Sequence, residues 1–275
     1  MAIVTFWSEC KKEIGQTSTA IAVATQMAIE HNYKILLIST YDTNEIDKAF
    51  WNDEKRNRGL KGIFENSKKV NIDSGIQGLT KVALSNKLTP NIITNYSKIV
   101  FKNNRLETLD GYTGKETDYE TILSVYPEVI LNASMYYDMV IVDLAREIDN
   151  PIIQKILETS NVIMYGLNQK MNTIDNFLNS DMQQKNNVIP YIGRYDKFSK
   201  YNSKNISRYL KTKKDINYLS YNTLYNEACE EGTVANLFLN LKQIKSEDKS
   251  LDILKESRKI SESIIYKIQE LELKI

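Results

Sequence analysis

Residues 2–44 read AIVTFWSECKKEIGQTSTAIAVATQMAIEHNYKILLISTYDTN, and this stretch decides the fold. Residues 2–8 alternate and are rich in β-branched side chains, which predicts a strand. Residues 17–29 repeat small and apolar side chains at helical spacing, and residues 34–39 form the near-continuous apolar run of a strand buried on both faces. This order of strand, polar loop, helix and strand predicts a βαβ unit that opens a doubly wound α/β domain, with its ligand at the first loop.

The rest of the chain predicts further elements of the same kind. We expect strands at residues 97–101, 105–109, 137–144, 161–167 and 188–192, and helices at residues 60–64, 75–84, 118–135 and 171–179. Pro127 is expected to kink or break its helix. We therefore predict a single α/β domain over residues 1–275, a doubly wound and mostly parallel sheet with helices on both faces. It has a less regular excursion at residues 59–120 and a C-terminal helix at residues 250–275.

Composition and charge exclude several classes of protein. The chain has 36 basic and 35 acidic residues, a net charge of +1, so the whole molecule is no polycation built for nucleic acid or acidic membranes. His31 is the only histidine, which excludes histidine-based catalytic triads and histidine-rich metal sites. Cys10 and Cys229 lack metal-type spacing and indicate free thiols in a reducing cytoplasm, so we expect a cytoplasmic protein.

The first loop carries a candidate phosphate site. Its residues are Lys11, Lys12, Glu13, Ile14, Gly15, Gln16 and Thr17, followed by Ser18. Taken alone, the loop fits an ordinary strand-to-helix turn equally well. It also resembles the deviant P-loop of the ParA/MinD family of ATPases. The resemblance implies that Lys11 is the signature lysine, Gly15 the last glycine and Thr17 the hydroxyl ligand of Mg²⁺, with ATP as the cofactor.

The loop departs from the family pattern at the residues that carry charge. Gln16 stands where a P-loop has the lysine that reaches the β- and γ-phosphates, and it brings no charge. Lys12 and Glu13 replace a pair of glycines. The family has two aspartates, one place apart, at the end of its second strand. Here Ser39 stands at the first of those places, and Asp42 comes one residue after the second. Asp42 is equally explained as a helix cap or a turn residue.

Two later motifs extend the resemblance over nearly the whole chain. Residues 137–144, YDMVIVDL, look like a Walker B strand whose carboxylate, Asp143, would join Thr17 at Mg²⁺. Residues 189–239 resemble the C-terminal third of ParA-type proteins. Gly193 occupies the place of the family's adenine-reading asparagine, and Asn222 lines the base pocket or serves as a turn residue.

A basic segment and the last helix suggest two further surfaces. Residues 190–214 contain eight basic residues and one acid, interleaved with aromatic side chains. The basic residues are Arg194, Lys197, Lys200, Lys204, Arg208, Lys211, Lys213 and Lys214. Such a segment binds DNA nonspecifically or forms a solvated basic face. The last helix has as many acids as bases, so we expect it to pack against the sheet and not to bind a membrane.

These observations lead to one functional expectation and two alternatives. The resemblance, together with the lost lysine, implies a pseudo-ATPase similar to the TadZ/CpaE branch. Such a protein would be a homodimer that positions or scaffolds a protein partner in DNA partition, conjugation or a secretion or pilus system. Because phosphoryl transfer depends on the missing charges, we lean toward a protein without enzymatic activity. The alternatives are a slow, active ATPase that segregates DNA and a membrane-associated MinD-like regulator.

Overall fold

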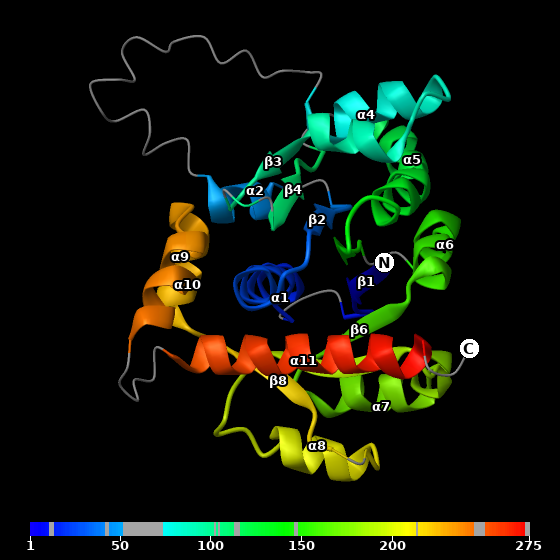
Figure 1. The fold of residues 1–275 in the computed structure, drawn as a ribbon. Coiled ribbons are helices and arrows are strands. Elements are labelled where there is room, and N and C mark those ends of the chain that lie inside the picture. Colours follow the sequence, from blue (N-terminus) through cyan, green and yellow to red (C-terminus); the bar gives the residue numbers. More distant parts are fainter. Residues whose placement is uncertain are drawn as a thin grey trace.

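One sheet organises the molecule. The computed structural model describes residues 1–10, 14–41, 44–51, 74–101, 103, 105–112, 116–145, 148–212, 214–244 and 251–272. Within these residues the sheet has eight strands in the order β3-β4-β2-β5-β1-β6-β7-β8 (Figure 1). The strands are β1 Ala2–Trp7, β2 Ile35–Ser39, β3 Ser97–Ile99, β4 Leu106–Leu109, β5 Met139–Asp143, β6 Val162–Leu167, β7 Val188–Tyr195 and β8 Asn217–Ser220. All neighbours pair in parallel except β3 and β4, which are antiparallel.

Helices cover both faces of this sheet. They are α1 Gln16–Glu30, α2 Glu45–Phe50, α4 Gly75–Leu84, α5 Glu116–Ser134, α6 Pro151–Thr159, α7 Met171–Asn179, α8 Ser203–Tyr209, α9 Thr223–Glu231, α10 Val234–Gln243 and α11 Asp252–Glu272. Short 3₁₀ turns lie at η2 Pro90–Asn95 and η3 Asp181–Gln184. The predicted doubly wound α/β fold is confirmed.

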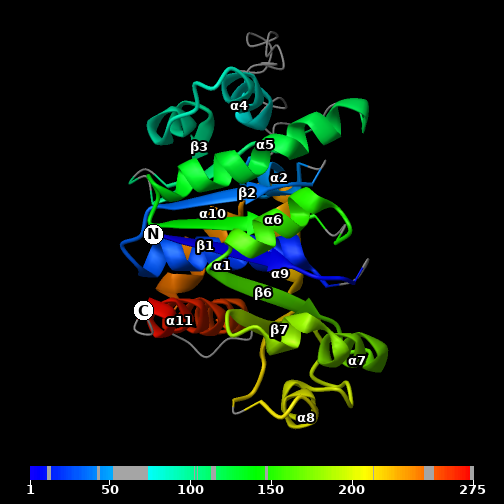
Figure 2. The ribbon, with the colours of Figure 1, turned by 90° about the vertical axis from the view of Figure 1, so that its right-hand side faces the viewer.

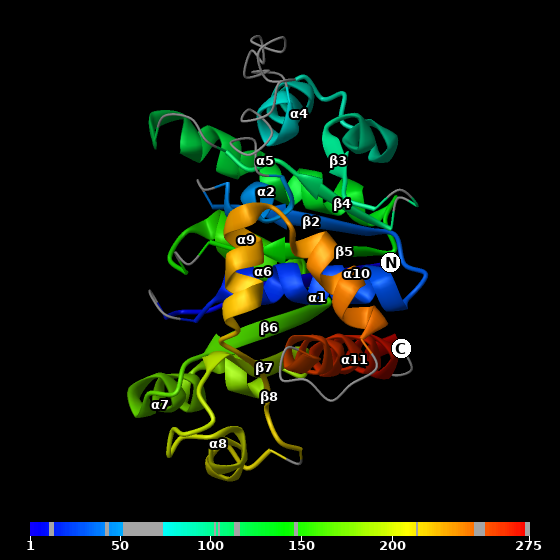
Figure 3. The ribbon, with the colours of Figure 1, turned by 90° about the vertical axis from the view of Figure 1, so that its left-hand side faces the viewer.

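Two hydrophobic cores fill the space between the sheet and its helices. Successive side chains of a strand point to opposite faces, so β1 contributes Ile3 and Trp7 to one core and Val4 and Phe6 to the other. The first core packs against α4, α5, α6 and α7, which face the viewer in Figure 2. The second packs against α1, α9, α10 and α11, which face the viewer in Figure 3. The central strand β1 therefore ends between both layers, where the first loop begins.

The C-terminal helix α11 is part of the second core. Its side chains Ile253, Ile260 and Ile264 are buried, and the helix contacts α1 and β8. The expectation that this helix packs against the fold is confirmed. Among the described residues, no helix is both long enough and apolar enough to cross a bilayer.

Several boundaries differ from the sequence-based expectation. The helix was expected to kink or break at Pro127, and a break is wrong, because α5 runs on from Glu116 to Ser134 with buried residues on both sides of the proline. A kink stays a prediction. Strand β7 extends to Tyr195, and α6 was not predicted. That helix begins at a cap, since the Asn150 side chain accepts a hydrogen bond from Ile152 N. The helix expected at residues 60–64 lies outside the described residues.

A carboxyl pair joins α2 to the β3–β4 hairpin and gives a pH prediction. Burial raises the pKa of Asp47 to about 8, and the neighbouring Asp110 carboxyl adds to the rise. Lys98 Nζ lies 2.5 Å from Asp110 Oδ2, and its positive charge acts in the opposite direction, lowering the pKa of Asp47. Because the folded-state pKa lies above the usual value of 3.8, the native protein binds the extra proton. This group's contribution to stability is therefore greatest below about pH 4 and is lost as pH rises through about 8.

Replacing Asp47 with asparagine should remove this pH dependence. We expect Asp47→Asn to raise the free energy of unfolding at pH 8.5 by about 1–3 kcal/mol, because no charge is then buried beside Asp110. At pH 4.5 the variant should match wild type. Urea unfolding at both pH values measures the difference. Asp138→Asn, a change at an exposed aspartate, is the control, and an equal effect of both variants would contradict the assignment.

Candidate functional site

The loop after β1 packs against Gly166 of β6 and Gly193 of β7. Ser8 Oγ donates to Gly166 O at 2.7 Å and accepts from Cys10 N at 3.1 Å. Ile14 is buried, and a Cβ built on Gly193 would lie 1.7 Å from Ile14 O. The backbone of Ile14 thus lies directly on Gly193, which explains why no side chain stands there. A residue that reads a base cannot occupy this position while the loop keeps this course.

The loop ends at Gly15, where α1 begins. Gly15 has φ 62° and ψ 39°, a left-handed conformation that glycine adopts without strain. The Gly15 carbonyl accepts hydrogen bonds from Thr19 N at 2.9 Å and Thr19 Oγ1 at 2.8 Å. The first turn of α1 contains no acidic residue. The positive end of the helix dipole is therefore not offset within its own first turn.

Gln16 turns inward and binds the Walker-like strand. Its side chain is 2% exposed, and Nε2 donates to Asp143 Oδ1 at 2.7 Å and to Leu144 O at 2.9 Å. Both partners accept only, so the amide group, and not the oxygen, must face them. Gln16 Oε1 is buried and has no hydrogen-bond partner among the described residues. The residue at the lysine position is thus engaged with the protein itself.

The two predicted metal ligands lie together but contact each other directly. Thr17 Oγ1 donates to Asp143 Oδ2 at 2.7 Å, and Ser39 Oγ lies 3.4 Å from the same oxygen. Asp143 is fully buried. Each oxygen of this carboxylate therefore already accepts a hydrogen bond from a neutral donor.

Gln16, Thr17 and Ser39 surround Asp143 with neutral side chains, none of which supplies a charge for the triphosphate of Mg-ATP. Each Asp143 oxygen has two lone pairs and the Thr17 hydroxyl keeps its own, so these hydrogen bonds alone do not bar a metal from the site. Ser39 supplies a hydroxyl where the resemblance implies a carboxylate, and Asp42 and Lys11 lie outside the described residues. Within the described part of the chain, no cluster of three histidine, cysteine or acidic side chains offers another metal site.

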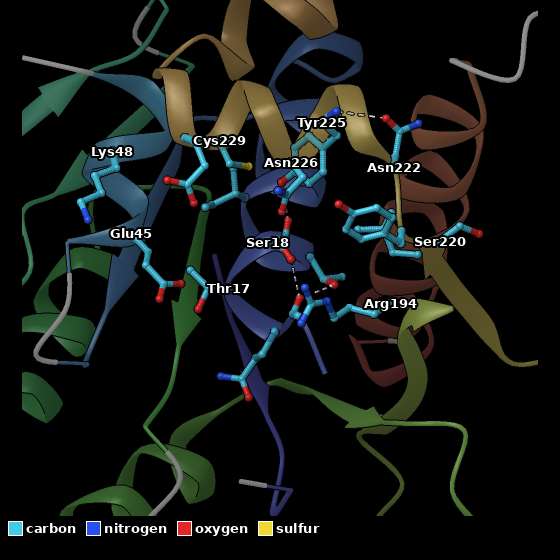
Figure 4. A pocket seen from close by; sticks show the side chains of 17 residues that line it. Thr17, Ser18, Glu45, Lys48, Arg194, Ser220, Asn222, Tyr225, Asn226 and Cys229 are labelled. Atoms are coloured by element: carbon cyan, nitrogen blue, oxygen red, sulfur yellow. Dashed lines mark hydrogen bonds between the residues drawn. The ribbon is translucent and has the colours of Figure 1, made fainter. Parts of the chain in front are cut away.

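A cavity of about 430 Å³ opens over the start of α1. Its lining comes from α1, α2, the ends of β7 and β8, and α9 with the connection before it, and includes Gly15, Thr17, Ser18, Glu45, Lys48, Arg194, Asn222 and Tyr225. In Figure 4 the Arg194 side chain extends toward the start of α1 near Ser18, while Glu45 and Lys48 approach from α2 on the other side. The cavity thus lies where the carboxyl ends of parallel strands meet, the usual ligand position in open α/β sheets.

Comparisons with known proteins identify the fold. No protein-family model matches the chain, and no curated protein sequence does. A plasmid partition protein of Borrelia burgdorferi bound to AMPPNP is 20% identical, with a TM-score of 0.58 over 99% of this chain and 98% of that one. Septum site-determining protein MinD of Pyrococcus horikoshii, complexed with Mg-ADP, is 13% identical, with a TM-score of 0.65 over 97% of this chain and 98% of that one. A ParA family ATPase of Chlorobium tepidum is 15% identical, with a TM-score of 0.63 over 93% and 97%. The chain has the ParA/MinD fold.

Asn222 was expected to line a base pocket or to serve as a turn residue, and its role at a base pocket stays a prediction. As the cap of α9, its side chain accepts from Tyr225 N at 3.0 Å, and the residue also lines the cavity. Tyr225 OH in turn donates to Ser18 O at 2.5 Å, and burial raises the Tyr225 pKa well above its usual value. In this ParA/MinD fold, α9 is therefore tied to the first turn of α1. Sequence reasoning missed Tyr225, which has no motif of its own.

The predicted basic segment divides into two parts. Arg194 lines the cavity, and a Cβ on Gly15 would lie 2.9 Å from Arg194 Cγ. The other described members are exposed around α8 and its flanking loops, at the β8 edge of the sheet: Lys197, Lys200, Lys204, Arg208, Lys211 and Lys214. Lys213 lies outside the described residues. Arg194 therefore belongs to the site at α1 and not to the exposed basic edge.

Proposed function

We propose that this protein is a ParA/MinD-like pseudo-ATPase that works as a positioning or scaffold protein. The observation that carries the proposal is the engagement of Gln16 Nε2 with Asp143 Oδ1 and Leu144 O. A P-loop lysine stabilises the charge that develops on the transferred phosphoryl group. Glutamine brings no charge, and here its amide is already bound to the carboxylate. One electrostatic contribution to phosphoryl transfer, that of the P-loop lysine, is thereby absent.

The proposed partners follow from the fold and from similar proteins. One similar structure is a complex of MinC with MinD of Aquifex aeolicus, and another is the partition protein with AMPPNP. They support a protein partner and a role in partition. We propose in addition a homodimer that positions cargo in the cytoplasm, which rests on the family resemblance. Partition, conjugation and secretion or pilus systems, the last as in the TadZ/CpaE branch, are the settings that we propose. The buried apolar face of α11 gives no support to the membrane-associated alternative.

A second candidate is a slow ATPase that binds and segregates DNA. The observation in its favour is the set of six exposed basic side chains around α8 at the β8 edge of the sheet. Salt-dependent DNA binding that is lost on charge removal at Lys211, Lys213 and Lys214 would support DNA binding. Turnover of ATP by the wild-type protein would be needed as well.

Calorimetry and turnover with a Gln16→Lys variant test the first proposal. We expect wild type to show no ATP turnover with Mg²⁺, and Gln16→Lys to bind Mg-ATP at least about tenfold more tightly, since a charged contact to phosphate is restored. Gln16→Met, which has a similar length and no charge, is the control. Measurable turnover by wild type that Gln16→Met abolishes would overturn the pseudo-ATPase and favour the second candidate.

A further inference from the structure

Two carboxyl groups join α2 to the chain after β4. Asp47 lies on α2, and Asp110 follows β4 directly. Asp47 Oδ1 and Asp110 Oδ1 are both buried without a hydrogen-bond partner among the described residues, and the two side chains lie within hydrogen-bonding reach of each other. Two carboxylates cannot donate to each other, so a hydrogen bond between them forms only when one of them is protonated. The contact between α2 and Asp110 therefore depends on one proton.

Asp110 is the fixed member of this pair. Its backbone oxygen accepts a hydrogen bond from Ile76 N at 3.0 Å, at the start of α4. Gly75 has φ 59°, and a Cβ built on it would lie 2.6 Å from Asp110 Cβ and 2.8 Å from Asp110 O. Lys98 of β3 forms an ion pair with the Asp110 side chain. Because α4 and the β3–β4 hairpin both hold Asp110, it cannot follow α2 if α2 moves.

Helix α2 is the member that can move. It has six residues, fewer than the about 12 that an isolated helix needs, and within the described part of the chain its N-cap residue makes no side-chain cap hydrogen bond. Packing therefore holds the helix in place. Ile46, Ala49 and Phe50 are buried in the second core, and Asp47 reaches Asp110. Of these contacts, only the one between the two carboxyl groups contains a proton that can leave.

Few other charged groups face Asp47. Lys98 is the cation that acts on it, and Tyr126 of α5 lies close enough to be affected by its charge. The helices α1 and α10 also pack on α2, but each carries one charged residue, and both residues lie at the far end of α1: Glu30 and Lys242. Four groups of α2 and α9 line the cavity over α1: Glu45, Lys48, Cys229 and Glu230. Loss of the proton therefore leaves two negative charges beside one lysine.

We propose that Asp47 and Asp110 form a proton-dependent contact that holds α2 against the β3–β4 hairpin and lets α2 move when the proton leaves to solvent. Because α2 carries Glu45 and Lys48 into the cavity over α1 (Figure 4), the contact links pH to the shape of that cavity. Burial and the neighbouring Asp110 raise the pKa of Asp47 to about 8. Opening lets this pKa fall toward its usual value, so a higher pH favours the open state. The inference does not depend on whether the protein hydrolyses ATP.

Trp51, the residue after α2, reports the movement. Its ring packs against Phe50, and Lys98 Nζ lies 5.4 Å from the ring centroid. A fluorescence titration of the full chain from about pH 6 to about pH 9.5 should shift the tryptophan emission to longer wavelength, with a midpoint near pH 8. Far-UV circular dichroism should stay constant over this range. Trp51→Phe keeps the buried Trp7 and should remove the shift, which assigns the signal to Trp51.

Three substitutions separate this mechanism from a general effect of pH. Asp47→Asn should abolish the transition, because the pair then has no acidic proton on α2 to lose. Asp110→Asn should lower the midpoint by about one pH unit or more, since a like charge is removed, whereas Lys98→Met should raise it, since the opposing positive charge is removed. Asp138→Asn, a change at an exposed aspartate, is the matched control and should titrate like wild type.

Four results would overturn the inference: a flat titration of wild type, a loss of circular dichroism together with the fluorescence change, an unaltered transition in Asp47→Asn, or midpoints that shift in the same direction in Asp110→Asn and Lys98→Met. If Asp110→Asn does not fold, the flat titration of Asp47→Asn and the raised midpoint of Lys98→Met decide the case. A merely structural role of the pair would not move the two midpoints in opposite directions.

Discussion

Gly193→Ala is expected to destabilise the protein by about 3 kcal/mol or more. Overpacking a well-packed core can cost this much, whereas most substitutions cost less. A Cβ at this position would lie 1.7 Å from Ile14 O and 2.9 Å from Ile14 C. These are backbone atoms, so the loop itself must move. Gly193 is not among the described glycines with positive φ, which are Gly15, Gly75 and Gly232. The need for glycine is therefore steric and not conformational.

Gly166→Ala is the matched comparison for this prediction. It makes the same change on the neighbouring strand, but its Cβ would meet side-chain atoms, with Ile14 Cγ2 at 2.7 Å as the nearest. A side chain yields more readily than a backbone, so we expect a loss of about 1–2 kcal/mol. Urea unfolding of both variants measures the order. If Gly193→Ala were as stable as wild type, Ile14 would not lie on β7 as the structure has it.

The same reasoning applies to the residue that the family resemblance leads one to expect. Gly193→Asn would restore an asparagine, yet it should destabilise the protein at least as much as Gly193→Ala, because the larger side chain meets the same backbone. An asparagine at this position and the observed course of the loop therefore exclude each other. A loop that lies on β7 leaves no room for the asparagine.

Strands and long helices were predictable because their burial imposes a pattern. The ILLIS of β2 and the MVIVD of β5 are buried at every position, which gives the continuous apolar runs that the sequence shows. Helix α6 was missed although it is as long as α7, which was predicted, and although its start carries two local signals, the cap at Asn150 and Pro151 as its first residue. Pro127 does not end α5, because the packing of the buried residues on both sides of the proline outweighs a local rule.

The site was predictable in its composition and not in its contacts. The sequence shows that Gln16 lacks charge, but not that its amide binds Asp143 and Leu144. It places Arg194 in a basic run, whereas its left-handed backbone, which no periodicity reveals, brings it to Gly15. Thr17 and Asp143, predicted as metal ligands, are brought together, but by a hydrogen bond to each other. Such contacts depend on tertiary register, which local patterns do not encode.

Gln16→Leu is expected to lower the free energy of unfolding by about 2–3 kcal/mol, because the buried Asp143 carboxylate loses a donor at Oδ1 and Leu144 O loses another. Leucine keeps the volume and helix propensity of this position. Gln16→Lys should be destabilised less, because an ammonium group supplies donors to both acceptors. Urea unfolding measures all three proteins under the same conditions.

A double-mutant cycle with Asp143→Leu separates the contact from general damage to the core. When both groups are replaced, neither polar partner is left unpaired, so the double variant should be more stable than the sum of the single losses by about 1–3 kcal/mol. Thr25→Val is the control, since Thr25 is buried on the same helix but its hydroxyl donates to Ile21 O. It should be additive with Gln16→Leu. Additivity within about 0.5 kcal/mol in both cycles would mean that Gln16 and Asp143 do not interact, and the proposed pseudo-ATPase would lose the observation that carries it.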